Sequence, residues 1–173
     1  EFTNMLSNEI SGTIKGGGLI DLPSAGNFTN NGVFAPGLSP GTLSVQGDYV
    51  STTNSVLDIE LNGLTQSTEY DLLATAGNAD FDGNILVSLG FNPSINDEFI
   101  IATTSSTINT CNLPATIASS FAGFDYEFDL ICRNNNELVL TVTAETLGIE
   151  SFEENSSVTL YPNPASDTIY FSN

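Results

Sequence analysis

Residues 78–84, "NADFDGN", have side-chain types and a spacing that could bind calcium. Oxygen-bearing side chains stand at positions 1, 3, 5 and 7 of a calcium-binding loop: Asn78, Asp80, Asp82 and Asn84. Gly83 occupies position 6, where such a loop turns sharply, but position 12 is Leu89 instead of a bidentate glutamate. The segment therefore predicts either a calcium site or an Asp-Gly turn that joins two strands.

Paired carboxylates are a second arrangement that could do chemistry, because glycoside hydrolysis requires two acids at a suitable separation. Asp58 and Glu60 would share one face of a strand, as would Asp80 and Asp82. The chain has no histidine, which removes the Ser-His-Asp and Cys-His catalytic arrangements. The glycine cluster "KGGGLI" lacks the spacing of a phosphate-binding loop. We interpret the acid pairs as solvated strand faces and expect no enzymatic activity and no cofactor other than calcium.

The two cysteines, Cys111 and Cys132, could form a disulfide or remain as two buried thiols. In an exported chain, one bridge closing a loop of about 20 residues contributes roughly 3 kcal/mol. Because the composition described below suits an extracellular protein, we predict the disulfide.

The segment "FAGFDYEF", residues 121–128, is rich in aromatic side chains. Alternation places Phe124, Tyr126 and Phe128 on one strand face, and Phe121 lies just before them. These rings could stack on sugars, but a hydrophobic cap over the end of a β structure is the preferred interpretation, because an open sheet end recruits other strands. The flanking cysteines could fasten such a cap.

The charge composition limits the classes of partner. The 173 residues contain 2 Lys plus Arg and 21 Asp plus Glu, a formal net charge of -19. Binding to nucleic acids or to anionic membranes depends on basic residues, so we expect neither. The apolar runs are far shorter than the roughly 20 residues of a spanning helix, so we expect no membrane insertion. An acidic chain rich in Ser, Thr, Asn and Gly is typical of an extracellular β protein.

Apolar and polar residues alternate with a period of two along most of the chain, which predicts strands and an all-β fold. The alternation is clearest in "VLDIEL" (56–61), "NILVSL" (84–89) and "ELVLTV" (137–142). Either an antiparallel β-sandwich or a parallel β-solenoid, also called a β-helix, would satisfy this pattern. The first 35 residues favour the solenoid, because very short strands alternate with Gly and with Asn residues that can form ladders between successive coils.

An ordered set of motifs between residues 2 and 143 resembles the parallel β-helix stalks of large bacterial surface proteins of the autotransporter-like type. The matching positions are Phe28, Asn30, Gly32, Pro36, Gly37, Ser39, Pro40, Gly41, Leu43, Tyr70, Asp71, Leu73, Gly77, Ala79, Phe81, Gly83, Ile85, Val87, Leu89, Gly90, Phe91, Pro93, Asp97 and Phe99. Asn96 stands where the family has glycine and retains the option of a positive φ. The resemblance implies a structural or adhesin stalk without an active site.

The pattern changes after residue 145. Residues 146–157 are acidic and aperiodic and predict a linker, while Pro162 and Pro164 should end one extended stretch before "DTIYF" begins another. The motif Leu160, Tyr161, Pro162, Asn163 and Pro164 resembles the start of the type A C-terminal sorting domain of the type IX secretion system of Bacteroidota. That resemblance implies recognition by the secretion translocon and its shuttle. Thr168, within "DTI", resembles a Bacteroidota O-glycosylation site.

We therefore expect a β-solenoid stalk with an aromatic cap at 1–145, a linker at 146–157, and at 158–173 the truncated start of a sorting domain, the first strands of a small β-sandwich. The expected function is that of a non-catalytic structural or adhesin segment outside the cell or on its surface. Two alternatives remain: a self-associating extracellular fibre subunit, and the accessory C-terminal region of a secreted polysaccharide-active enzyme that contacts surface glycans.

Overall fold

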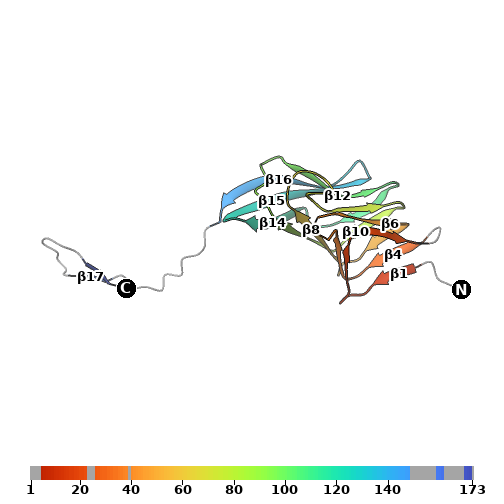
Figure 1. Cartoon of the computed structure of the whole chain (residues 1–173), viewed down its shortest axis with the longest axis horizontal. Coiled ribbons are helices and arrows are strands. Elements are labelled where there is room, and N and C mark those ends of the chain that lie inside the picture. Colours follow the sequence, from red (N-terminus) through yellow and green to blue (C-terminus); the bar gives the residue numbers. More distant parts are fainter. Residues whose placement is uncertain (1–4, 23–25, 39, 149–158, 162–169, 173) are drawn as a thin grey trace.

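A computed structural model describes residues 5–22, 26–38, 40–148, 159–161 and 170–172 (Figure 1). These residues form strands and connecting turns, with no helix among them, so the expected all-β class is confirmed. In the same residues, no helix is long and apolar enough to span a membrane. The strands are β1 (Met5–Asn8), β2 (Thr13–Gly16), β3 (Gly18–Asp21), β4 (Asn27–Asn30), β5 (Val33–Pro36), β6 (Thr42–Gln46), β7 (Asp48–Ser51), β8 (Val56–Leu61), β9 (Leu72–Thr75), β10 (Ala79–Asp82), β11 (Asn84–Leu89), β12 (Glu98–Thr104), β13 (Ile108–Asn112), β14 (Thr116–Phe121), β15 (Phe124–Arg133), β16 (Glu137–Leu147), β17 (Thr159–Tyr161) and β18 (Tyr170–Ser172).

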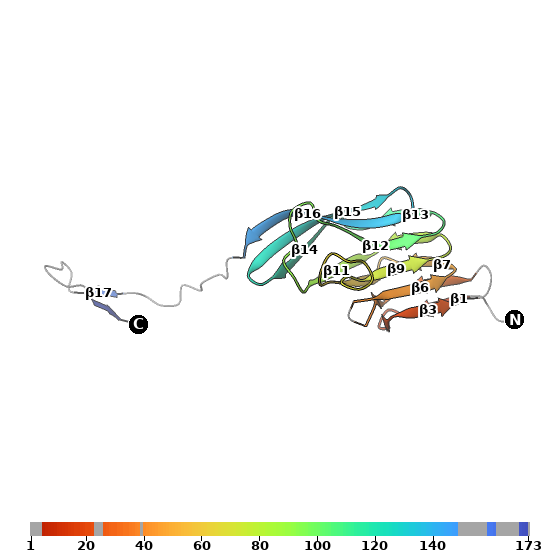
Figure 2. The same cartoon turned by 45° about the horizontal axis from the view of Figure 1, so that its top comes forward.

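Each of the strands β1 to β10 pairs in parallel with the strand three places further along the chain. One sheet has the order β1-β4-β7-β10-β13, a second has β2-β5-β8-β11, and a third begins β3-β6-β9-β12. We call each run of three consecutive strands a layer: β1–β3, β4–β6, β7–β9 and β10–β12. Figure 2 shows the layers in sequence order, from red through orange and yellow to green.

The third sheet is mixed. Beyond β12 it continues with β16, β15 and β14, each antiparallel to its neighbour. We call β14, β15 and β16 the C-terminal hairpins. They lie at the opposite end of the stack from β1–β3 (Figure 2).

The alternation in the sequence accounts for which side chains point inward. In β8, Leu57, Ile59 and Leu61 are buried, while Asp58 and Glu60 face outward. The predicted strands at 84–89 and 137–142 also form, as β11 and the first part of β16. The short strands expected near the N-terminus are present, since β1 to β5 have 4 residues each.

Inward-facing residues of successive layers lie one above another and form the core. Phe28 is aligned with Tyr49, and their rings are stacked with centroids 5.9 Å apart. Phe34 contacts both rings, at centroid distances of 5.2 and 5.5 Å, and all three side chains are fully buried. Phe81 of the fourth layer extends this aromatic column beyond Tyr49. The core therefore runs through the layers as one column.

A ladder of polar side chains stabilises one corner of the stack. Asn8 and Asn30 occupy equivalent positions in adjacent layers and are both buried. The Asn8 Nδ2 atom donates to Asn30 Oδ1 (2.8 Å) and to the Val33 carbonyl (3.0 Å). Buried amides require such partners, so the predicted asparagine ladder between layers is confirmed for this pair.

The C-terminal hairpins cover the apolar interior beyond the fourth layer. Ala122 and Gly123, both with positive φ (51° and 84°), connect β14 to β15 in a tight turn. Tyr126 and Phe128 are buried and belong to the same hydrophobic cluster as the layers. The Ser119 hydroxyl donates to the Val87 carbonyl of β11 (2.8 Å). The expected inward direction of the aromatic segment is confirmed, and its strands are antiparallel.

The strand β16 continues to Leu147, two residues beyond the expected end of the stalk at 145. Further along, β17 and β18 form an antiparallel pair, in which Tyr161 is aligned with Tyr170. Two extended stretches therefore flank Pro162 and Pro164, as predicted. The residues of the sorting motif that follow Tyr161, together with Thr168, lie outside the described residues.

Candidate functional site

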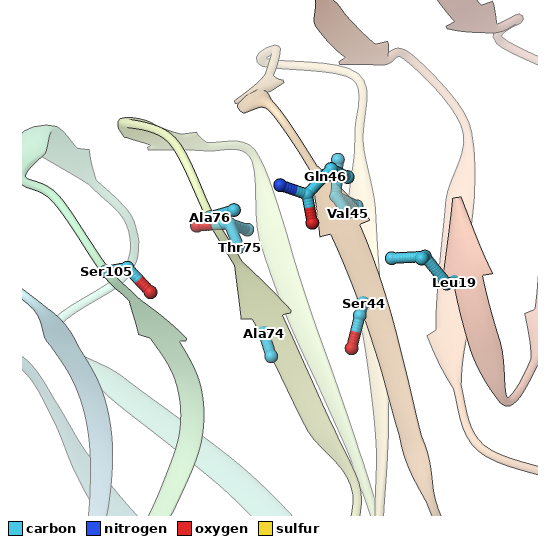
Figure 3. A pocket seen from close by; sticks show the side chains of 8 residues that line it. All are labelled: Leu19, Ser44, Val45, Gln46, Ala74, Thr75, Ala76 and Ser105. Carbon is cyan, nitrogen blue, oxygen red and sulfur yellow. The ribbon is translucent and has the colours of Figure 1, made fainter. Parts of the chain in front are cut away.

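A shallow groove of about 250 Å³ crosses the outer face of the third sheet (Figure 3). Its floor consists of outward positions of successive layers, among which Leu19 is aligned with Ser44, and Ser44 with Ala74. Ser44 and Ala74 have small side chains that leave the sheet surface uncovered beside Leu19, so the groove follows from residue size. The lining residues are Leu19, Ser44, Val45, Gln46, Ala74, Thr75, Ala76 and Ser105.

None of the residues that line the groove is charged. Figure 3 shows the Gln46 amide, the Ser44 hydroxyl and the Ser105 hydroxyl along its length. Hydroxyl and amide groups donate and accept hydrogen bonds but supply no general acid or base near neutral pH. The groove can therefore hold a neutral polar ligand. No motif in the sequence indicated it, because small residues on a strand face are common.

The predicted acid pair Asp58 and Glu60 lies on the outer face of β8, beside Lys15 of β2. The Lys15 Nζ atom is 3.5 Å from Glu60 Oε1. Partial burial raises the pKa of the Asp58 carboxyl, and the negative charge of Glu60 raises it further. The positive charge of Lys15 opposes this rise. These groups form a small partly solvated charge cluster on the sheet surface.

Asp71 is a buried carboxylate that connects two neighbouring layers. Its Oδ1 atom accepts from the backbone N–H of Gly41 (2.8 Å), and its Oδ2 atom accepts from the backbone N–H of Glu60 (2.9 Å). Burial raises its pKa, although the two backbone hydrogen bonds oppose that rise. Gly37 also belongs to this contact, because a Cβ atom there would lie 2.3 Å from Asp71 Oδ1. Asp71 therefore has a structural role, because it joins the turn at Gly41 to the strand that contains Glu60.

The predicted calcium residues lie around the corner between β10 and β11. Asp80 and Asp82 both point outward from β10, whereas Asn84 is exposed at the start of β11. Asp82 Oδ1 accepts from the Gly83 N–H (2.7 Å) and from Asn112 Nδ2 (3.1 Å). The Asn78 side-chain oxygen accepts from the hydroxyl of a serine in the next turn. This is the Asp-Gly turn that the sequence offered as the second interpretation.

Gly83 has a structural role at this corner that needs no metal. Its φ is 93°, and a Cβ atom there would lie 2.4 Å from the Ser55 carbonyl of the layer beneath. In the described part of the chain, no three His, Cys, Asp or Glu side chains are placed to hold a metal ion together. Calcium binding by these residues stays a prediction.

The predicted disulfide is present between Cys111 and Cys132. Cys111 lies on β13, the last strand of the first sheet, and Cys132 lies on β15. The bridge therefore links the parallel layers to the C-terminal hairpins covalently.

Asn96, in the turn before β12, has a φ of 74°. An asparagine at this position can adopt such a positive φ, as expected from the sequence.

The aromatic segment does not present its rings to solvent as a sugar-stacking strip. Tyr126 is 2% exposed and Phe128 is 0% exposed, and the rings of Phe128 and Phe99 meet at a centroid distance of 6.4 Å. Phe121 and Phe124 are partly buried against the same cluster. The segment is part of the core.

No protein-family model matches this chain, and no curated protein is similar to it.

Proposed function

We propose that the described layers are the end of a parallel β-solenoid, a non-catalytic stalk or adhesin segment, and that residues 158–173 begin a type IX secretion sorting domain. The protein then acts outside the cell or on its surface. The observation that supports the solenoid most strongly is the constant pairing step: each strand of the first three layers pairs in parallel with the strand three places later. The inner column of Phe28, Tyr49 and Phe81 agrees with stacked coils.

Deleting one whole layer tests the solenoid. Met5, Asn27 and Asp48 occupy equivalent positions in successive layers, so removal of residues 27–47 brings Asp48 to the place of Asn27. In a solenoid each coil contacts only its neighbours, and the shortened protein should fold cooperatively with the β-type circular dichroism of the parent. A deletion of 27–36 removes two strands of one layer and should abolish folding. If both deletions unfold the protein, the solenoid proposal is wrong.

Two observations support a location outside the cell. The Cys111–Cys132 disulfide is compatible with an oxidising compartment, and "LYPNP" at 160–164 resembles the first motif of the sorting domain. In the natural host, replacing Pro162 and Pro164 with alanine should retain the protein inside the cell. Replacing Glu153 and Glu154 of the predicted linker with glutamine is the matched control and should leave export unchanged. Equal export of both variants would contradict the assignment.

The uncharged groove supports a second candidate function, contact with a neutral glycan. Its hydroxyl and amide side chains can bind sugar hydroxyls, whereas an anionic polysaccharide would meet a protein of net charge -19. Affinity electrophoresis with neutral polysaccharides tests this function. Ala74→Trp, which fills the groove, should remove any retardation, whereas Leu86→Trp on the outer face of β11 should not. Retardation that persists in Ala74→Trp would exclude the groove.

A further inference from the structure

The sequence contains two Asn-Gly pairs, Asn31-Gly32 and Asn62-Gly63. This dipeptide has a reactivity of its own. The backbone nitrogen of the glycine can attack the side-chain carbonyl carbon of the asparagine, because glycine has no side chain that obstructs the approach. A five-membered succinimide ring then forms, and the amide group leaves as ammonia. In a folded protein the reaction requires that the two groups are free to meet.

The first pair is held between neighbouring layers. The Asn31 Nδ2 atom donates to the Asn8 carbonyl (3.3 Å), and Asn31 Oδ1 accepts from the Thr52 hydroxyl (3.1 Å). The Gly32 N–H donates to Asn30 Oδ1 (3.3 Å), and Gly32 is buried. Both reacting groups are therefore engaged, and they cannot turn toward each other unless the stack opens at this corner.

The second pair lies in the loop that follows β8, where Asn62 is exposed. The Asn62 N–H donates to the Glu69 carbonyl (2.7 Å), and the Thr65 N–H donates to Glu69 Oε2 (2.8 Å). These contacts hold the loop on either side of the reacting groups. Within the described residues, the Asn62 side chain and the Gly63 N–H have no hydrogen-bond partner. The side chain can therefore rotate toward the Gly63 nitrogen.

We propose that Asn62 is a site of spontaneous deamidation in the folded protein, and that the stack protects Asn31 from the same reaction. The Gly63 nitrogen forms a bond to Cγ of Asn62, and its proton goes to the departing amide, which leaves as ammonia. Water then adds to one of the two succinimide carbonyls and opens the ring, giving aspartate or isoaspartate at position 62. The conversion consumes water and adds a negative charge. This inference is independent of the proposed function.

The product changes a loop that connects two layers. Gln66 Nε2 in this loop donates to the Ile100 carbonyl of β12 (2.9 Å). The new carboxylate lies in the same short loop as Glu69, whose carboxylate is packed against Gly63. Isoaspartate also inserts an extra methylene into the main chain. Charge repulsion and the longer backbone should both loosen the loop, so amides of residues 62–70 should exchange faster in the converted protein.

Ageing the full chain at mildly alkaline pH, followed by peptide mass mapping, tests the site. The peptide that contains Asn62 should acquire the mass of the acid and separate chromatographically into aspartate and isoaspartate forms. The peptide that contains Asn31 should convert more slowly by about tenfold or more, because Asn31 reacts only from rare opened states. In concentrated urea the stack no longer protects Asn31, and the two pairs should convert at similar rates.

Two variants show whether the reaction uses the Gly63 nitrogen. Gly63→Ala places a methyl group beside that nitrogen and should slow the conversion by about tenfold. Alanine fits the backbone there, because Gly63 is not in the left-handed region. Leu64→Ala is the matched control, since Leu64 is 58% exposed and outside the pair, and it should convert at the parent rate.

Three results would overturn the proposal. The first is no conversion at position 62 in the folded protein. The second is equal rates at Asn31 and Asn62 in the folded protein. The third is a Gly63→Ala variant that converts as fast as the parent.

Discussion

The parallel layers and the C-terminal hairpins bury the same kind of side chains but connect their strands in different ways. In the layers, strand partners are distant in sequence, as with Asn27 and Asp48. In the hairpins, they can be almost adjacent, as with Phe121 and Phe124. The strands of the layers have 4 to 7 residues, whereas β15 and β16 have 10 and 11.

This difference explains how the stack ends. A parallel layer always leaves a free edge for a further parallel strand, so stacking alone does not stop. An antiparallel hairpin folds back on itself through a tight turn, and its side chains can close the interior. The change from parallel to antiparallel pairing at β12 and β16 therefore marks the end of the repeating part.

The largest expected effects are those of two core substitutions, which test whether the parallel layers and the C-terminal hairpins unfold together. Phe34→Ala removes a fully buried ring of the second layer and should cost about 3–5 kcal/mol of unfolding free energy. Phe128→Ala in the hairpins should cost a similar amount, and because Phe128 packs on Phe99 of β12, it should shift the same single transition. Urea unfolding followed by circular dichroism measures both. Leu64→Ala, at an exposed leucine, is the control. Two separate transitions in the Phe128 variant would show that the hairpins fold independently.

Removal of the disulfide should weaken the connection between the two regions. Replacing Cys111 and Cys132 with alanine removes a link across 21 residues, and should lower the unfolding free energy by about 3 kcal/mol. Hydrogen exchange should accelerate most in β13, β14 and β15, and least in the second layer. Acceleration that is uniform over the whole protein would show that the bridge does not act on this junction in particular.

Asp71→Asn should destabilise the parallel layers by about 1–2 kcal/mol at neutral pH. The amide can accept from only one of the two backbone N–H groups, of Gly41 and Glu60, that the carboxylate now binds, and leaves the other without a partner. Chemical denaturation of both proteins under the same conditions measures the loss.

The pH dependence provides a second test of the same residue. Burial raises the pKa of Asp71 above its ordinary value of 3.8, so the folded protein binds this proton more tightly than the unfolded chain. Its contribution to stability is therefore fully present below that ordinary value and is lost as the pH rises through the folded pKa. The Asn variant should lack this part of the pH dependence. An identical pH profile in both proteins would contradict the assignment.

The smallest expected effect lies in a hairpin turn. Ala122 has a φ of 51°, a left-handed conformation that is unfavourable for alanine, and it precedes Gly123. Ala122→Asn creates the Asn-Gly pair that such turns prefer and should stabilise the protein by about 0.5–1 kcal/mol. Ala118→Asn, within β14, is the control and should not stabilise. Thermal unfolding compares the two, and a loss of stability in Ala122→Asn would contradict the turn geometry.

The sequence predicted much of the local structure for clear reasons. The alternation in "VLDIEL" predicted that Ile59 and Leu61 face inward, because side chains of a strand point to opposite faces in turn, and it left Val56 or Leu57 as the third, which the structure resolves as Leu57. Cys111 and Cys132 are the two cysteines of the sequence, so only one disulfide pairing was possible. The Asp-Gly turn at 82–83 could also be predicted from the sequence, because glycine is typical of tight turns.

The sequence could not show where Asp71 finds its partners. Gly41 is thirty residues earlier and Glu60 is eleven residues earlier, and neither contact leaves a local pattern. The groove beside Ser44 and Ala74 was equally hidden, since it depends on strands from three layers lying side by side. These features exist only once the partners of each strand are fixed.

The amino-acid sequence by itself determined the all-β class, the inward face of the strong strands and the acidic character of the protein. The tertiary structure decided which strands pair and where parallel pairing changes to antiparallel. The physical reason is that side-chain alternation specifies the face of a strand but not its neighbour. Every residue except proline offers the same backbone donor and acceptor to either edge, so partner choice depends on packing between residues that are distant in the chain.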